Sequence, residues 1–301
     1  MGLIENKNLF NVQSKVDLSE KIIRGELESG SGVLVLRNAY SDPKTLDNVS
    51  SFFYKRIKEE EQNGLTTNNL DLPHSNKRLW CSLNKLAEEH PVDFVDYYGN
   101  EWLHKVSKAW LGPIYQIISE VNVVVAGENS QMGHRDYPMG FYSKNLMKNV
   151  PPGLSKSAPF MSLQGVVVHH NTPIEMGPTR FVLGSQNDVD GYLTFRDKDE
   201  QKRFQLNATQ FDLFKGDLLF FNPYIFHGAG SNRTNISRLV NLIQISSGIV
   251  KSLEHLNFVE LIKNIFPVLS QMSDREKVEK VCRVITDCWP FPTNFNTDPP
   301  A

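Results

Sequence analysis

Gly216-Asp-Leu-Leu-Phe-Phe-Asn-Pro-Tyr-Ile-Phe-His-Gly-Ala-Gly-Ser-Asn-Arg-Thr-Asn-Ile-Ser-Arg238 combines a short apolar run, a histidine and a loop rich in Gly and Asn. The run has the length and aromatic content of a buried strand, and turn-forming residues bound it on both sides. The same pattern recurs at 121–126, 163–169, 181–183, 211–214 and 239–245. Short strands at this spacing predict a β-sandwich or barrel rather than βαβ units.

Helical patterns flank this β-rich part on both sides. On the N-terminal side a strand at 33–36 precedes a helix that opens with Asp42-Pro43, and apolar spacing over 80–118 predicts two or three further helices. On the C-terminal side, apolar positions from Leu253 to Leu269 and the capping box from Ser273 to Glu276 predict two more helices.

We therefore expect a mainly β fold with flanking helices, built as one domain over residues 1–301. The β core would occupy about residues 120–250, with the N-terminal strand and helices in 1–119 and the C-terminal helices in 251–301.

Composition excludes several classes of function. The chain has 301 residues, and its 32 basic and 34 acidic residues give a net charge of −2, so no electrostatic footprint for nucleic acid is visible. No apolar stretch approaches the roughly 18 residues of a membrane helix. The three cysteines include no Cys-X-X-Cys pair, which argues against a disulfide framework or a zinc ribbon. A cytoplasmic location is expected, without a membrane partner.

His134-Arg135-Asp136 is the first candidate for chemistry. In an extended segment, residues two apart project to the same side, so the imidazole and the carboxylate can bind one cation together. A tripeptide of this kind also occurs by chance, and a surface histidine beside an aspartate is the simpler interpretation of it alone.

His227 strengthens the case, because it ends a second predicted strand. Two histidines and one carboxylate leave three adjacent open positions on a metal, which suits non-haem Fe(II) binding a bidentate 2-oxo acid and O2. Arg238 opens the next strand and has the planar guanidinium that pairs with a distal carboxylate. Arg233 is its nearest rival for that role.

Together with Met176-Gly-Pro-Thr179-Arg-Phe-Val-Leu-Gly-Ser-Gln186, these motifs resemble the phytanoyl-CoA dioxygenase family over about residues 30–250. The resemblance implies a double-stranded β-helix (jelly roll or cupin-like) core and dependence on Fe(II), 2-oxoglutarate and O2. It implies iron on His134, Asp136 and His227, with Arg238 on the C5 carboxylate. Gln131 and Thr179 match positions that often contact the co-substrate in relatives.

The resemblance further implies oxidation of a small organic substrate, with release of succinate and CO2. Asp136 argues against halogenation, because halogenase relatives lack this carboxylate. Hydroxylation, desaturation and oxidative ring closure stay open, as does the substrate. A carboxylated natural product of specialised metabolism or an amino-acid-derived intermediate is the favoured class, and a fatty acyl-CoA is also compatible. Relatives usually have Asn where this chain has Met176, and His where it has Gln186.

Substrate contacts are expected from Arg78, Tyr137 and Tyr142, whose side chains flank the expected mouth of the site. Cationic and aromatic groups there suit a carboxylated molecule, although a solvated basic loop would have the same composition. The apolar stripe from Leu253 to Leu269 would pack on the β core or form a dimer interface, so the chain is expected to be a monomer or a homodimer.

Two other functions remain open. A catalytically silent β-helix protein would keep the fold and only bind 2-oxoglutarate or a metal. A zinc hydrolase would use the same three ligands with a metal-bound water, would not need Arg238 and would work without O2.

Overall fold

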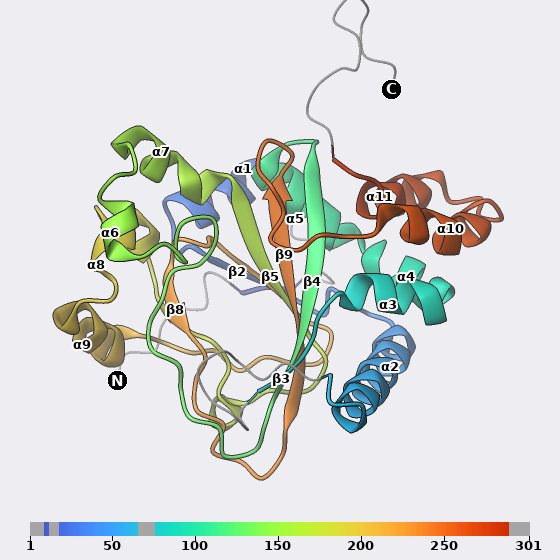
Figure 1. Cartoon of the computed structure of the whole chain (residues 1–301), viewed down its shortest axis with the longest axis horizontal. Helices are drawn as coiled ribbons and strands as arrows, with labels where there is room; N and C mark the ends of the chain where they lie inside the picture. The colour runs from blue at the N-terminus through green and yellow to red at the C-terminus, as the bar shows by residue number, and fades with distance from the viewer. Residues whose placement is uncertain (1–8, 12–17, 66–75, 289–301) are drawn as a thin grey trace, which may run out of the picture.

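The computed structural model describes residues 9–11, 18–65 and 76–288. A seven-stranded sheet has the order β1-β2-β7-β5-β9-β4-β3, and β6 and β8 form a second, two-stranded sheet (Figure 1). The strands are β1 (Leu9–Asn11), β2 (Val33–Arg37), β3 (Lys77–Leu79), β4 (Tyr115–Val124), β5 (Ser162–Val168), β6 (Arg180–Val182), β7 (Leu218–Phe221), β8 (Phe226–Gly228) and β9 (Arg238–Ser247). The large sheet therefore includes strands from residues before 120.

Helices flank the strands on two sides. Figure 1 shows α2, α3, α4, α10 and α11 on one side, beside β4, and α6, α8 and α9 on the far side, near β8. The helices are α1 (Glu20–Glu28), α2 (Pro43–Gln62), α3 (Ser82–Glu89), α4 (Pro91–Tyr98), α5 (Glu101–Leu111), α6 (Lys144–Met147), α7 (Pro152–Ser157), α8 (Gly191–Thr194), α9 (Lys198–Asn207), α10 (Phe258–Leu269) and α11 (Arg275–Ile285). In the part of the chain that the structure describes, no helix combines the length and apolar character needed to cross a membrane.

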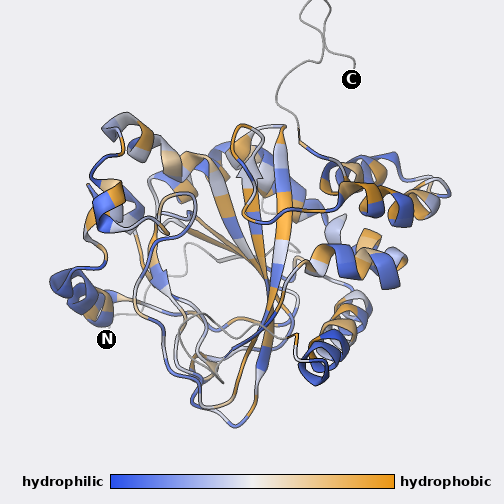
Figure 2. Cartoon of the chain, in the orientation of Figure 1, coloured by the Kyte–Doolittle hydropathy of each residue, from blue (hydrophilic) through white to orange (hydrophobic). Residues whose placement is uncertain are grey.

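The strand register decides which side chains face inward. β4 pairs antiparallel with β9 from Tyr115↔Ser247 to Val124↔Arg238, and β5 pairs with both β7 and β9. Because side chains alternate along a strand, Val121 and Val123 pack in the large core under the helices, whereas Asn122 and Val124 line an interior cavity. The central strands carry much of the apolar sequence, while α9 is almost entirely hydrophilic (Figure 2).

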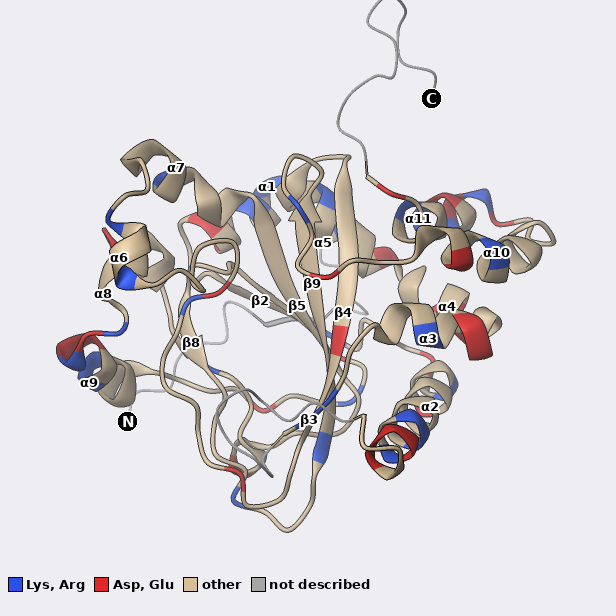
Figure 3. Cartoon of the chain, viewed as in Figure 1, with Lys and Arg blue, Asp and Glu red and all other residues tan. Residues whose placement is uncertain are grey.

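Charged residues are also distributed unevenly between the strands and the rest of the molecule. Lys, Arg, Asp and Glu side chains gather on the helices and loops, and the central strands carry few of them (Figure 3). β4 is an exception, because its sequence includes one charged residue, Glu120, and this side chain is buried. A carboxylate in a buried strand requires a partner or a function.

The sheet-rich core and the flanking helices confirm the predicted class, but one predicted strand is absent and several helix boundaries differ. Residues 211–214 form no strand: Leu213 makes only an isolated bridge with Thr172, and the Phe214 N–H donates to the Asp217 carboxylate instead of a neighbouring strand. The three helices of the 80–118 region end at Leu111, and Gly112, with φ of 81°, then turns the chain into β4.

The C-terminal helices begin later than predicted. α10 starts at Phe258, so Leu253 and Leu256 precede it, with the Asn257 side chain accepting from the Glu260 N–H. α11 is capped by Asp274 and not by Ser273, because the Asp274 carboxylate accepts from the Lys277 N–H at 3.0 Å.

Candidate metal centre

The backbone holds His134 and His227 directly opposite each other. The His134 N–H donates to the His227 carbonyl at 2.7 Å, and the His227 N–H donates back to the His134 carbonyl at 3.0 Å. His227 lies in β8, which β6 pairs in antiparallel register. Two histidines far apart in sequence therefore form one antiparallel bridge, and their ring centroids lie 4.5 Å apart.

Asp136 completes a group of three. Its Oδ1 lies 3.6 Å from His134 Nε2, and its Oδ2 lies 3.2 Å from His227 Nε2. One ligand atom from each residue can be chosen so that all lie within 4.8 Å of one another, and no other such group occurs among the described residues. Gln164, from β5, donates to Asp136 Oδ2 at 2.6 Å and fixes the carboxylate from the sheet side.

Both imidazoles are oriented by their other nitrogen. His134 Nδ1 lies 3.0 Å from the Met132 carbonyl, and His227 Nδ1 lies 2.9 Å from the Ile225 carbonyl. A carbonyl only accepts, so Nδ1 carries a proton in both rings, and Nε2 is the ring nitrogen left for a metal on the Asp136 side. This is how proteins orient imidazoles that bind a metal, and the donor set suits a divalent cation.

Charge at the site also favours a cation. Burial alone would raise the pKa of Asp136, but His134, His227 and the hydrogen bond from Gln164 together hold it below its ordinary value. Burial lowers the pKa of His134, and the Asp136 charge opposes this. An ionised carboxylate beside two imidazoles is thus ready to coordinate.

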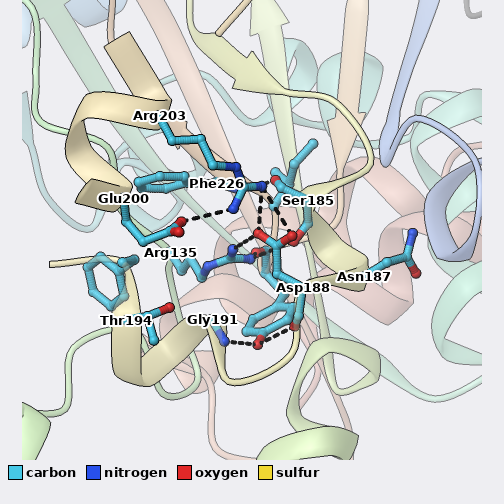
Figure 4. A network of polar contacts seen from close by, with 12 residues as sticks. Arg135, Ser185, Asn187, Asp188, Gly191, Thr194, Glu200, Arg203 and Phe226 are labelled. Atoms are coloured by element: carbon cyan, nitrogen blue, oxygen red, sulfur yellow. Dashed lines mark hydrogen bonds and ion pairs between the residues drawn. The ribbon is translucent and has the colours of Figure 1, made fainter. Parts of the chain in front are cut away.

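Arg135 lies between the two ligands in sequence and anchors the segment, and Figure 4 shows its guanidinium in a polar network with Asp188. The Arg135 side chain is 1% exposed and donates to the Ser185 carbonyl at 2.8 Å, to the Tyr224 carbonyl, and to Asp188 Oδ2 at 2.6 Å. The guanidinium also lies 4.4 Å from the Tyr224 ring centroid. Period-two alternation puts the ligands on one side and this arginine on the other.

Further contacts surround this anchor. Arg203, from α9, also holds Asp188, at 2.8 Å, and Glu200 pairs with Arg203 at 2.9 Å. A side chain at Gly191 would place its Cβ 2.5 Å from the Arg135 guanidinium carbon, so glycine is needed there. The sequence carried no signal for this network, because its members are far apart and follow no motif.

Replacing Arg135 by methionine is expected to lower Fe(II) affinity by about 10- to 100-fold, the usual effect of removing a group that orients a metal ligand. It also leaves Asp188 with one arginine fewer and so lowers thermal stability. Anaerobic calorimetric titration with Fe(II) and thermal unfolding measure the two effects. Arg203→Met is the matched control, since it removes the other arginine on Asp188 and touches no part of the ligand segment. Unchanged Fe(II) affinity in a folded Arg135→Met protein would show that the anchor does not position the ligands.

A cavity of about 1220 Å³ opens from the three ligands into the space between the sheets. Arg238 lines it and is 5% exposed; its Nε donates to the Met176 carbonyl at 2.9 Å and its Nη2 to the Gly177 carbonyl at 2.7 Å. Burial lowers the pKa of Arg238 to about 10. No carboxylate of the described residues pairs with it, so a buried guanidinium faces the cavity with its charge uncompensated.

The other residues expected near the co-substrate lie at the same cavity. Thr179 and Gln131 both line it, and Gln131 Oε1 accepts from the Ala229 N–H at 3.1 Å, which ties it to the loop after His227. Arg180 packs 4.6 Å from the Phe204 ring centroid instead of facing the cavity. Arg233, the rival of Arg238, is exposed and lies outside the cavity wall.

Of the three expected substrate contacts, only Arg78 lines the cavity; Tyr137 and Tyr142 do not belong to its wall. The Tyr137 hydroxyl donates to the Lys251 carbonyl, which turns the ring away, and Phe141 lies at the cavity instead. Sequence reasoning missed Asn76, Glu120, Asn122 and Arg196, all in the wall.

Comparison with known proteins identifies a matching family and several similar structures. A family model described as phytanoyl-CoA dioxygenase matches residues 30–240. Among solved structures, the non-haem α-ketoglutarate-dependent carbocyclase SnoK from nogalamycin biosynthesis has a TM-score of 0.55 at 16% identity, with 77% of this chain and 85% of SnoK covered. AviO1 from Streptomyces viridochromogenes Tue57 has 0.50 at 13%, covering 77% and 96%. The epimerase SnoN, also α-ketoglutarate-dependent and from nogalamycin biosynthesis, has 0.50 at 14%, covering 76% and 83%. No curated protein matches the chain.

Proposed function

Because the chain belongs to the phytanoyl-CoA dioxygenase family, we propose that it is an Fe(II)- and 2-oxoglutarate-dependent dioxygenase acting on a small organic substrate. The observation that carries the proposal is the group of His134, Asp136 and His227, with both Nε2 atoms and the carboxylate converging. Two histidines and one carboxylate are the ligand set of non-haem Fe(II) oxygenases that use a 2-oxo acid.

The chain's own residues have separate tasks in this proposal. The three ligands hold iron on one face, and Arg238 receives the C5 carboxylate of 2-oxoglutarate, which would compensate its buried charge. Thr179 and Gln131 would contact the co-substrate between these points. When bound, iron, 2-oxoglutarate and O2 supply the oxidising power, with succinate and CO2 as co-products.

The architecture fits the same proposal. A large sheet faces a smaller one across the cavity, as a double-stranded β-helix (jelly roll) core would. We take residues 1–301 as a single oxygenase domain, supported by β2, which joins the large sheet, and by α10, which packs on α3 and α4. A cytoplasmic location and a monomeric or homodimeric state stay predictions from sequence.

For the substrate, we propose a carboxylated natural-product or amino-acid-derived molecule. The cavity exceeds the roughly 300–1,000 Å³ of ordinary ligand pockets, so it has room for co-substrate and substrate together. Arg196 supports a carboxylate: it lines the cavity, and no described acidic side chain pairs with it. Hydroxylation, desaturation and ring closure all fit, and the similar structures include both a carbocyclase and an epimerase.

The decisive experiment is anaerobic addition of Fe(II) and 2-oxoglutarate to the metal-free protein, followed by O2. We expect a weak visible charge-transfer band that requires both additions, and then slow release of succinate. Binding of metal without a band would support the silent binding protein or the zinc hydrolase. Hydrolytic activity with Zn(II) in the absence of O2 would identify the hydrolase.

A further inference from the structure

One wall of the cavity is polar, and none of its side chains belongs to the group of candidate metal ligands. β3 pairs antiparallel with β4 in the register Arg78↔Asn122, so four side chains from the edge of the large sheet face the cavity together. We call this group the β3–β4 cluster; it consists of Asn76, Arg78, Glu120 and Asn122. Asn76, Glu120 and Asn122 are 3%, 4% and 7% exposed.

Three buried atoms of the cluster have no hydrogen-bond partner among the residues that the structure describes. They are Asn76 Oδ1, Asn122 Oδ1 and Arg78 Nε. Buried polar atoms without partners are rare in folded proteins and destabilise them, so several together in a cavity wall need an explanation. A bound molecule that supplies the missing partners provides one.

The charges of the cluster decide which molecule fits. Arg78 Nη1 donates to Glu120 Oε2 at 2.8 Å, so the guanidinium is already compensated and does not demand a ligand carboxylate. Both amide oxygens and the Glu120 carboxylate are acceptors. Arg78 Nε is a donor, so the unpartnered atoms are two acceptors and one donor, and a ligand group that donates to both asparagine oxygens fits this wall.

Two residues of the cluster lie on β4, the strand whose last residue pairs with Arg238. Val124 is opposite Arg238 in the sheet, and Asn122 and Glu120 follow at about 7 and 13 Å along β4. Burial raises the pKa of Glu120 to about 7, Arg78 opposes this rise, and the charges of Glu254 and Asp136 add to it. Trp80, Phe141 and Leu253 supply apolar wall beyond the cluster.

Resting on the proposed function, we propose that the β3–β4 cluster is the subsite for a hydrogen-bond donor group of the organic substrate, an ammonium or a hydroxyl. The two asparagine oxygens and Glu120 accept from that group, and Arg78 holds Glu120 in place. An amino-acid-derived substrate would then present its amine here and its carboxylate to another cation of the cavity.

Fragment binding tests this without knowledge of the substrate. The protein is loaded with Zn(II) and 2-oxoglutarate, so that Arg238 is occupied, and titrated with benzylamine, benzyl alcohol or benzoate under ligand-observed NMR. We expect benzylamine or benzyl alcohol to bind in the millimolar range and benzoate not to compete. The stronger of the two donors identifies the group.

Variants locate the binding. Asn122→Leu is expected to weaken the bound fragment at least tenfold and, by removing an unpartnered buried oxygen, to raise the midpoint of thermal unfolding. Asn122→Asp keeps the acceptors and should retain benzylamine. Asn129→Leu is the matched control, because Asn129 lines the same cavity but is exposed, and less than a twofold change is expected.

Displacement of the bound donor by benzoate, equal binding of the donor to Asn122→Leu, no binding of either donor, or a lower unfolding midpoint in Asn122→Leu would each overturn the subsite. The charge-transfer band with Fe(II) and 2-oxoglutarate separates this from the proposed function. A band retained in Asn122→Leu with no fragment selectivity overturns only the subsite, whereas selective fragment binding without any band overturns only the oxygenase.

Discussion

Replacing His227 by alanine is expected to weaken Fe(II) binding at least about 100-fold and to abolish succinate formation, because one of three protein ligands is lost. The side chain is 5% exposed, and its Nε2 lies 3.2 Å from Asp136 Oδ2. A water molecule that filled the space of the ring would bind the metal less firmly than the imidazole does. The backbone bridge to His134 does not involve the ring and should remain.

Anaerobic Fe(II) titration, the charge-transfer band and the succinate assay measure this loss. His255→Ala is the control, because that histidine is exposed and lies outside the group of ligands. A folded His227→Ala protein that keeps the band would remove His227 from the proposed ligand set and with it the main support for an iron oxygenase.

Replacing Arg238 by methionine should leave Fe(II) binding nearly intact and raise the dissociation constant for 2-oxoglutarate about 30-fold or more. Losing one partner of a buried charge pair costs about 2 kcal/mol or more, which corresponds to that factor. The guanidinium is placed by the Met176 and Gly177 carbonyls, so lysine, with a different geometry, should restore binding only in part.

Titration of the anaerobic iron protein with 2-oxoglutarate gives the constant directly. Arg233→Met removes the same charge from the same loop and strand region but from an exposed side chain, so it should change the constant less than twofold. A larger effect at Arg233 than at Arg238 would transfer the carboxylate site to Arg233.

Part of the site could be predicted because it depends on local rules. His134 and Asp136 are two residues apart in an extended segment and must face the same way, and His227 ends a run that reads as a buried strand. Arg238 is the first residue of β9, a strand that the sequence pattern also predicts. Local rules do not bring these residues to one point in space, and their joint role was predicted from the resemblance to the family.

The remainder depends on contacts that no local pattern encodes. Arg78 was expected to contact the substrate, but its pairing with Glu120 follows from the β3–β4 register and had no signal in the sequence. Asp188 reaches Arg135 through tertiary packing across 53 residues. Tyr137 lies in a long insert whose conformation no sequence pattern predicts, and its hydroxyl donates to the Lys251 carbonyl.

The boundaries of helices and strands also depended on side-chain contacts that the sequence pattern does not encode. Strand and helix types followed from periodicity, whereas the ends of elements depended on competing side-chain hydrogen bonds. Asp217 satisfies the Phe214 N–H and so prevents a strand at 211–214, and Asp274 takes over the start of α11 from Ser273.

The reciprocal backbone bridge between His134 and His227 sets both ligands in place by hydrogen bonds that no metal needs to supply. Such a preformed site discriminates little between divalent ions, because Ni(II), Cu(II) and Zn(II) all bind nitrogen and oxygen donors more tightly than Fe(II) does. Selection of iron then falls to the supply of metals around the protein. Protein purified in contact with traces of zinc or nickel would be inactive through mismetallation, with its fold unchanged.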